Sequence, residues 1–90
     1  MEKRIGSVLI LVRDTTISPR LNSIIAKHAH IVLGRQGLPA RTSGFSLISL
    51  VLEGTTDEIG SLTGQLGKLP GIEVKSVVLK QRTGDENEKM

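Results

Sequence analysis

Two histidines are the side chains of this sequence that could serve as bases or metal ligands near neutral pH. His28 and His30 are two residues apart, and imidazole is a good ligand for zinc, copper and nickel. On a helix, residues at this spacing point to nearly opposite sides, so the pair cannot hold one ion together. A histidine near a helix end is also favoured by the helix dipole. We therefore expect structural histidines and no metal site.

Enzymatic chemistry has little support in the sequence. The chain contains no cysteine, which excludes disulfides, thiolate metal ligands and a cysteine nucleophile. A serine or threonine nucleophile needs a neighbouring base, and only the two histidines could supply one. Between Val12 and Leu21 there is no glycine-flanked phosphate loop ending in arginine, the loop that acylphosphatases carry. We expect a protein that is not an enzyme and that carries no cofactor.

Basic residues are concentrated in the first half of the chain. Residues 1–41 hold seven Lys or Arg and two acids, whereas residues 42–79 hold two Lys and four acids. Most of the cations in the first half stand singly: Arg4, Arg13, Arg20, Lys27, Arg35 and Arg41. A solvated face explains this spacing better than a nucleic-acid patch, but a nucleic-acid-binding regulator that uses the basic half is the alternative function. Phe45 is the one aromatic residue, which is too few to stack bases on a sheet.

The apolar pattern predicts the elements that position these residues. Four segments rich in leucine and β-branched residues predict strands, over residues 4–13, 31–39, 45–53 and 72–79. A helix is expected from about residue 18 to residue 29, with Ser18 as its cap and Pro19 in its first turn. A second helix is expected up to Leu69, opened by a capping box of Thr55 and Glu58.

The order β-α-β-β-α-β predicts an α+β, ferredoxin-like sandwich: a four-stranded antiparallel sheet with two helices on one face. Residues 1–80 are expected to form one domain, and residues 81–90 a disordered polar tail. The sequence has neither the roughly 18 consecutive apolar residues of a membrane span nor a signal peptide. We therefore expect a cytoplasmic protein that does not bind a membrane.

Both faces of the two central strands are apolar. Alternation places Leu9 and Leu11 on the side opposite Val8 and Ile10, and Leu47 and Val51 on the side opposite Leu50 and Leu52. A lone two-layer domain needs one apolar sheet face, so the second row predicts a contact with another protein surface. The simplest partner is a second copy, which makes a homo-oligomer through Leu9, Leu11, Leu47 and Val51 the expected assembly.

Three glycines lie on one side of the second predicted helix. Gly60, Gly64 and Gly67 are opposite its apolar stripe, and each costs about 1 kcal/mol relative to alanine in a helix interior. Either this is a weak surface helix, or another helix or a ligand approaches it closely.

Three blocks of sequence carry a family resemblance, over residues 31–39 (IVLGRQGLP), 46–59 (SLISLVLEGTTDEI) and 62–72 (LTGQLGKLPGI). Together they resemble the iron-only hydrogenase system regulator family, which is related to the C-terminal domain of CopG-type nickel-responsive repressors and to ACT-like domains. The resemblance implies an ACT-like regulatory or ligand-sensing domain in transcription regulation. It would self-associate and act through a small-molecule effector or a protein partner.

The resemblance also indicates which functions the chain lacks. In the nickel-responsive relatives, histidines and a cysteine bind the metal, and the matching positions here are Leu38, Ala40 and Ser46. Only His28 lies near a ligand position of those relatives, so the resemblance implies no metal site. Those relatives also carry a ribbon-helix-helix segment for DNA, whereas here the regulatory strand begins by Ile5.

ACT-like domains place effectors near the loop between the first strand and the first helix, which here contains Asp14, Thr15 and Thr16. A helix N-terminus favours an anion, and Arg35 beside Gly37 could complete a pocket. An ordinary capped turn fits the same loop, because Asp14 itself would oppose an anion.

Overall fold

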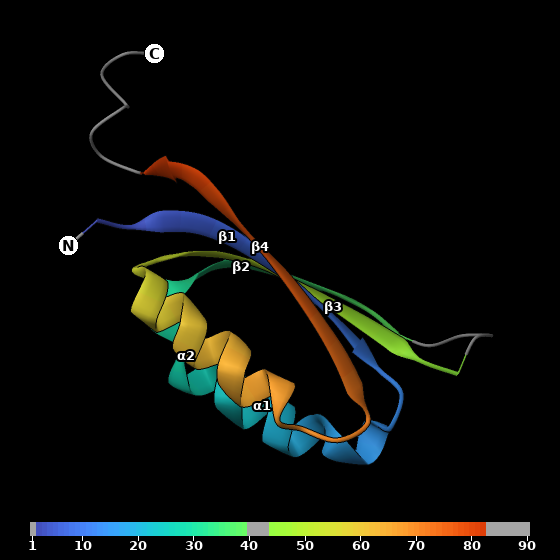
Figure 1. The fold of residues 1–90 in the computed structure, drawn as a ribbon. Coiled ribbons are helices and arrows are strands. Elements are labelled where there is room, and N and C mark those ends of the chain that lie inside the picture. Colours follow the sequence, from blue (N-terminus) through green and yellow to red (C-terminus); the bar gives the residue numbers. More distant parts are fainter. Residues whose placement is uncertain (1, 40–43, 83–90) are drawn as a thin grey trace.

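The computed structural model describes residues 2–39 and 44–82 and is drawn in Figure 1. Its strands are β1 (Arg4–Val12), β2 (Val32–Leu38), β3 (Ser46–Gly54) and β4 (Ile72–Arg82). The α-helices are α1 (Ser18–Lys27) and α2 (Thr56–Gly67), and two short 3-10 helices, η1 (Thr15–Ile17) and η2 (Ala29–Ile31), flank α1. This order confirms the predicted α+β, ferredoxin-like fold.

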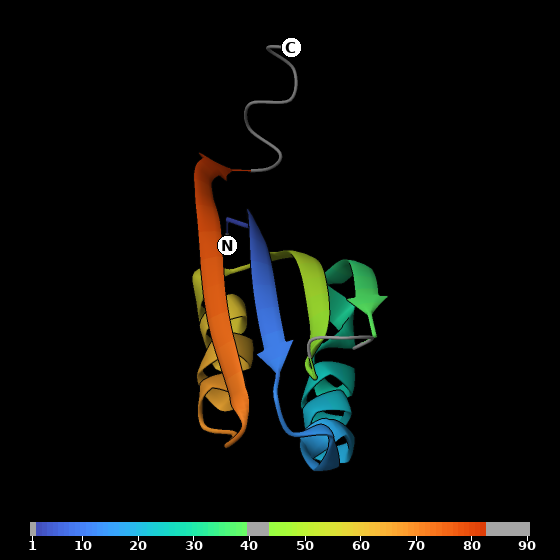
Figure 2. The same ribbon diagram turned by 90° about the vertical axis from the view of Figure 1, so that its right-hand side faces the viewer.

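The four strands form one antiparallel sheet in the order β2-β3-β1-β4. The inner strands are therefore β1 and β3, as predicted, and β2 and β4 are the edges. Both helices cover the same face of this sheet, and the other face carries no helix (Figure 1, Figure 2).

The core lies between the sheet and the two helices. In β1, every second residue is buried, with Val8 and Ile10 fully inaccessible to solvent. The strand pairing places Val8 beside Leu50, and this row packs against the apolar stripes of the helices. Those stripes are formed by Leu21 and Ile25 of α1 and by Ile59, Leu62 and Leu66 of α2.

The start of α1 differs from the prediction. Ser18 is the first helical residue rather than the cap, and Ile17 at the N-cap makes no side-chain hydrogen bond. The reason is that η1 runs directly into α1, so that the capping function moves to the start of η1. There the carboxylate of Asp14 accepts from the Thr16 N–H, and at the other end of η1 the Ser18 N–H donates to the Thr15 carbonyl.

Strand boundaries also differ from the expected ones, most of them by one residue. Ile31 lies in η2, so β2 begins at Val32. At the other end of the chain, β4 continues to Arg82 instead of ending at Leu79, because it pairs with β1 as far as Arg4, with a register shift between Arg4 and Gly6. The rest of the predicted tail, residues 83–90, lies outside the described residues.

The predicted capping box of α2 is present. The Glu58 N–H donates to the Thr55 hydroxyl at 3.1 Å, and the Thr55 N–H donates to the Glu58 carboxylate at 2.8 Å.

None of the helices in the described part of the chain has the length and apolar character that a membrane crossing needs.

Candidate functional site

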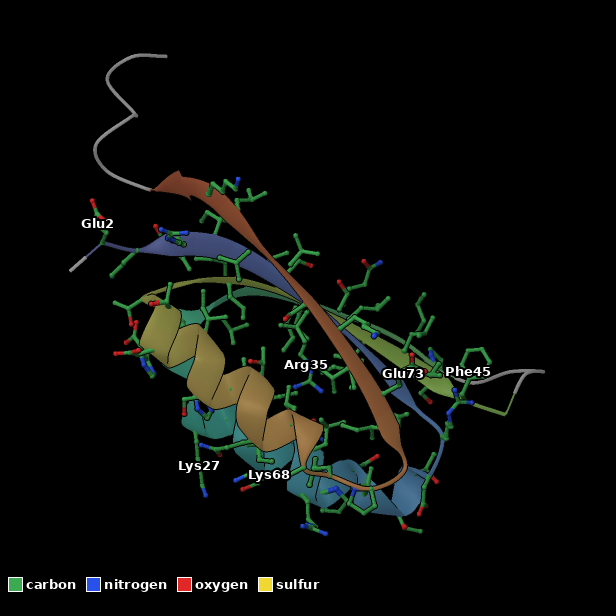
Figure 3. All side chains as sticks on the ribbon, in the orientation of Figure 1. Glu2, Lys27, Arg35, Phe45, Lys68 and Glu73 are labelled. Carbon is green, nitrogen blue, oxygen red and sulfur yellow. The ribbon has the colours of Figure 1, made fainter. Side chains whose placement is uncertain are left out.

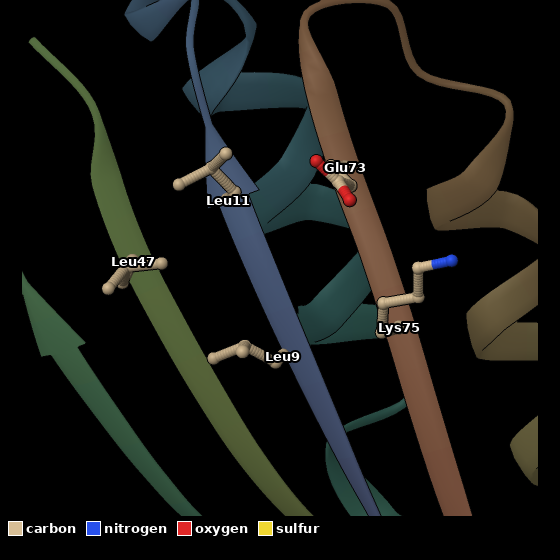
Figure 4. Close-up of a pocket in the computed structure, with 5 residues that line it drawn as sticks. All are labelled: Leu9, Leu11, Leu47, Glu73 and Lys75. Atoms are coloured by element: carbon tan, nitrogen blue, oxygen red, sulfur yellow. The ribbon is translucent and has the colours of Figure 1, made fainter.

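The helix-free face of the sheet carries a hollow with an apolar floor. The hollow has a volume of about 220 Å³ and is lined by Leu9 and Leu11 of β1, Leu47 of β3, and Glu73 and Lys75 of β4. Figure 4 shows Leu9 and Leu11 on β1, with Leu47 on β3 to one side of them and Glu73 and Lys75 on β4 to the other. Three of the four residues expected at an oligomer contact are thus brought together around one hollow.

The fourth expected residue, Val51, lies farther along the same face. It is exposed and stands opposite Ser7 of β1, and Val77 of β4 is also opposite Ser7. Val51 and Val77 therefore extend the apolar surface across three strands. Val77 is 65% exposed and Leu9 is 51% exposed, so the face is largely open to solvent.

Sequence reasoning missed the part of this face that lies on the edge strands. On β2, Leu38 is exposed and stands opposite Leu47. On β4, Val77 and Leu79 are exposed. A signal was available, because Glu73, Lys75, Val77 and Leu79 alternate with Ile72 and Val74, which pack against the core.

One end of the hollow is charged. Glu73 and Lys75 lie on the same side of β4, and Arg13, which follows β1, donates to the Glu73 carboxylate at 3.2 Å. Both partners of this ion pair are more than half exposed, and an exposed pair adds little stability. The hollow thus combines an apolar floor with both signs of charge along its β4 side.

In the predicted effector loop, the Asp14 carboxylate is hydrogen-bonded within the loop itself. Asp14 Oδ1 accepts from the Thr16 hydroxyl at 2.7 Å and from the Thr16 N–H at 3.0 Å. These bonds from Thr16 hold the pKa of the Asp14 carboxyl below its ordinary value. The backbone N–H of Asp14 donates in turn to the Gly71 carbonyl, which ties the loop to the start of β4.

The other predicted members of that site lie on β2. The Arg35 guanidinium donates to the side-chain carbonyl of Asn22 on α1 at 2.7 Å, so it is directed toward the helix. Gly37 is exposed and pairs with Ile48, with open space where a side chain would be. Arg35 is thus hydrogen-bonded to α1, whereas the Asp14–Thr16 loop is hydrogen-bonded within itself and to Gly71. The two parts of the predicted site therefore have separate partners.

His28 is buried between the two helices. Its Nδ1 lies 2.8 Å from the Ile24 carbonyl oxygen, and its Nε2 lies 3.0 Å from the Ser61 hydroxyl. Both ring nitrogens are therefore used within the protein, which is the structural role predicted for it.

His30 is exposed and lies apart from that network. Its Nε2 is 3.4 Å from a Glu58 carboxylate oxygen. Within residues 2–39 and 44–82, no three His, Asp or Glu side chains gather as a metal-binding cluster. Of the positions matched to metal ligands, Leu38 and Ser46 lie on neighbouring strands, and Ala40 lies outside the described residues.

The sequence matches a family model over residues 4–76, and that family is described as "TM1266-like: Iron-only hydrogenase system regulator, putative". The chain belongs to this family. Among curated proteins, none matches the sequence.

Solved structures agree with this assignment. The uncharacterized protein TM1266 from Thermotoga maritima has a TM-score of 0.82 and 35% sequence identity, covering 88% of this chain and 100% of that one. The ACT domain of the GTP pyrophosphokinase from Chlorobium tepidum has a TM-score of 0.68 and 17% identity, covering 83% and 99%. CPII from Thiomonas intermedia, solved bound to ADP, AMP and acetate, has a TM-score of 0.53 and 11% identity, covering 98% and 96%. At these lower identities the last two show a likeness of fold alone.

Proposed function

We propose that this protein is a cytoplasmic, non-enzymatic regulatory domain that self-associates through the helix-free face of its sheet and responds to a small effector. The observation that carries the proposal is the open apolar surface formed by Leu9, Leu11, Leu47 and Val51. A surface of this kind, left in water, favours association with another protein surface.

A second copy of the chain is the partner that fits this surface. A two-fold contact brings the same patch of each copy together, so the patch must be self-complementary. Here the leucine floor can pack on the leucine floor, while Lys75 of one copy meets Glu73 of the other. Opposite charges at the rim would fix the register of the contact more than its strength.

The mass of the protein in solution tests this contact. We expect sedimentation at micromolar concentration to give an oligomer for the native chain and a monomer for Leu47→Glu, because a charge would be placed in the contact. Ala26→Glu is the matched control, since Ala26 is exposed on α1, on the opposite face. A native chain that sediments as a monomer would refute self-association.

The effector is proposed to bind at the loop of Asp14, Thr15 and Thr16, and Arg35 and Gly37 of β2 are its further proposed contacts, which requires Arg35 to leave Asn22. Support comes from the ACT-like fold, since CPII, a protein of related fold, was solved bound to ADP, AMP and acetate. Binding of an anion would require the Asp14 carboxylate to release the Thr16 N–H. A ligand that displaces Asp14 would therefore change the loop and the start of α1 together.

An NMR titration with amino acids, nucleotides and small anions tests the loop site. Shifts confined to the amides of Thr15, Thr16 and Gly37 are expected for a ligand that binds there. Asp14→Asn removes the competing charge, and it should strengthen the binding of an anion. Shifts elsewhere, with these amides unchanged, would place the effector site in another part of the domain.

A further inference from the structure

A second hollow lies on the helical side of the molecule, opposite the face proposed for self-association. It is a groove of about 360 Å³ lined by Pro19, Arg20, Ser23, Ile24 and Lys27 of α1 and by Leu69, which follows α2. The groove runs beside the surface of α1 that is turned toward the end of α2.

The charged residues that line this groove, Arg20 and Lys27, are both positive. Arg20 and Lys27 are seven residues apart, so they lie on one side of α1, and α1 contains no acidic residue. Lys68 precedes the lining residue Leu69, and Figure 3 shows Lys27 and Lys68 pointing away from the sheet on the helical side. Among the described residues, no carboxylate lies within ion-pair distance of these three cations.

Two other cations of the first half of the chain have polar partners away from the groove. Arg13 is paired with Glu73 on the sheet, and Arg35 donates to Asn22 on the opposite side of α1. Arg20 and Lys27 line the groove and Lys68 precedes its lining residue Leu69, so these three cations form a local excess of positive charge on the helical side.

The floor of the groove is apolar. Ile24 is half-buried and packs against the core, between Arg20 and Lys27 along the helix. The aliphatic stems of those two side chains extend this apolar strip, as long basic side chains commonly do. The groove therefore offers a place for one apolar side chain between groups that attract carboxylates.

We propose that this groove binds an acidic, amphipathic segment of a partner protein, with its carboxylates toward Arg20, Lys27 and Lys68 and one apolar side chain on Ile24. A peptide segment fits better than a nucleic acid for two reasons. Three cations are few for tracking a phosphate backbone, and the lining contains no aromatic side chain on which a base could stack.

This site goes beyond the proposed function and does not depend on it. The groove and the sheet hollow share no lining residue and lie on opposite layers of the sandwich. A self-associated regulator could therefore present one groove per copy to its partner.

Fluorescence anisotropy with a labelled synthetic peptide tests the proposal. The probe is a glutamate-rich amphipathic peptide with a leucine on its apolar side, and the full-length chain is titrated at low and at physiological salt. We expect binding that weakens with salt, and a loss of affinity of about tenfold or more for the double variant Arg20→Glu/Lys27→Glu. Lys80→Glu on β4 changes the net charge by half as much as the double variant, away from the groove, and should bind as the native chain does.

Two altered peptides and a competing oligonucleotide distinguish an acidic amphipathic segment from other ligands of the groove. A peptide with serine in place of the leucine should bind more weakly, and a lysine-for-glutamate peptide should not bind. Circular dichroism and sedimentation must show that the double variant keeps its fold and mass. The proposal is overturned if the acidic peptide does not bind at low salt, if the serine peptide binds equally well, or if a single-stranded oligonucleotide of equal charge displaces the peptide.

Discussion

His28, which follows α1, and Ser61 of α2 are joined by a hydrogen bond of 3.0 Å between Nε2 and Oγ. The Ile24 carbonyl lies 2.8 Å from Nδ1, and since a carbonyl only accepts, the proton of the neutral ring is on Nδ1. Nε2 then accepts from the Ser61 hydroxyl, and the Gln65 amide donates to the same oxygen at 3.2 Å. This chain of bonds fixes how the two helices sit against each other.

Replacing His28 should therefore destabilise the domain. His28→Leu keeps the bulk of the side chain but leaves the Ser61 hydroxyl and the Ile24 carbonyl without their partner. We expect the free energy of unfolding to fall by about 1–3 kcal/mol, the cost of unpaired, part-buried polar groups. Urea unfolding at neutral pH measures it.

His30→Leu is the matched control, because His30 is exposed and its contact with Glu58 is 3.4 Å long. It should lower the urea midpoint only slightly. Equal midpoints for the two variants would show that the His28 network does not contribute to stability.

The sequence predicts the structural role of His28 but not its partner. Helical periodicity places His28 on the apolar face with Leu21 and Ile25, which is a local property. That Ser61 meets it, 33 residues away, depends on how two helices pack, and no local pattern encodes that packing. For the same reason the sequence predicts the sheet face on which Leu9 and Leu11 lie, but it does not predict the hydrogen bond from Arg35 to Asn22.

Gly64 of α2 and Gly54 at the end of β3 give predictions of opposite sign. At Gly64 a methyl group would meet nothing within 4 Å, so Gly64→Ala should stabilise the helix by up to about 1 kcal/mol. At Gly54, just before the helix, a methyl group would lie 2.9 Å from Ile31 Cγ2, so Gly54→Ala should destabilise the domain. Thermal unfolding of the two variants compares them.

A loss of stability in Gly64→Ala would contradict this reasoning and would indicate that the glycine face of α2 is in close contact with a second chain. Gly60→Ala, which also has open space around it, repeats the test one turn earlier.

The carboxyl group of Glu58 makes the free energy of unfolding of the domain depend on pH in the acid range. The hydrogen bond from the Thr55 backbone holds the pKa of its carboxyl below the ordinary value of 4.5, against a smaller opposing effect of desolvation. A lowered pKa means that the carboxylate stabilises the fold above its unfolded pKa, and that this contribution is lost as pH falls through the folded pKa. We expect Glu58→Gln to reduce the fall in stability between about pH 5 and pH 3.

Asp57→Asn is the control for that pH series. It removes a charge from the same first turn of α2 but leaves both bonds of the capping box in place. If Glu58→Gln and Asp57→Asn reduce the fall in stability at acid pH equally, then negative charge near the start of α2 causes that pH dependence, and the capping hydrogen bond does not.

The last prediction concerns metal. Purified protein is expected to hold no stoichiometric nickel, zinc or iron, because Leu38 and Ser46, at positions that the sequence resemblance matches to the ligands of nickel-responsive repressors, supply neither imidazole nor thiolate. His28 could not compensate, since both of its ring nitrogens are hydrogen-bonded within the protein and a metal would have to displace Ser61 or Ile24. Elemental analysis after dialysis against buffer with each metal, without chelator, measures the content. A tightly held ion for every chain, lost in His28→Ala but kept in His30→Ala, would show that the helix interface opens to bind metal.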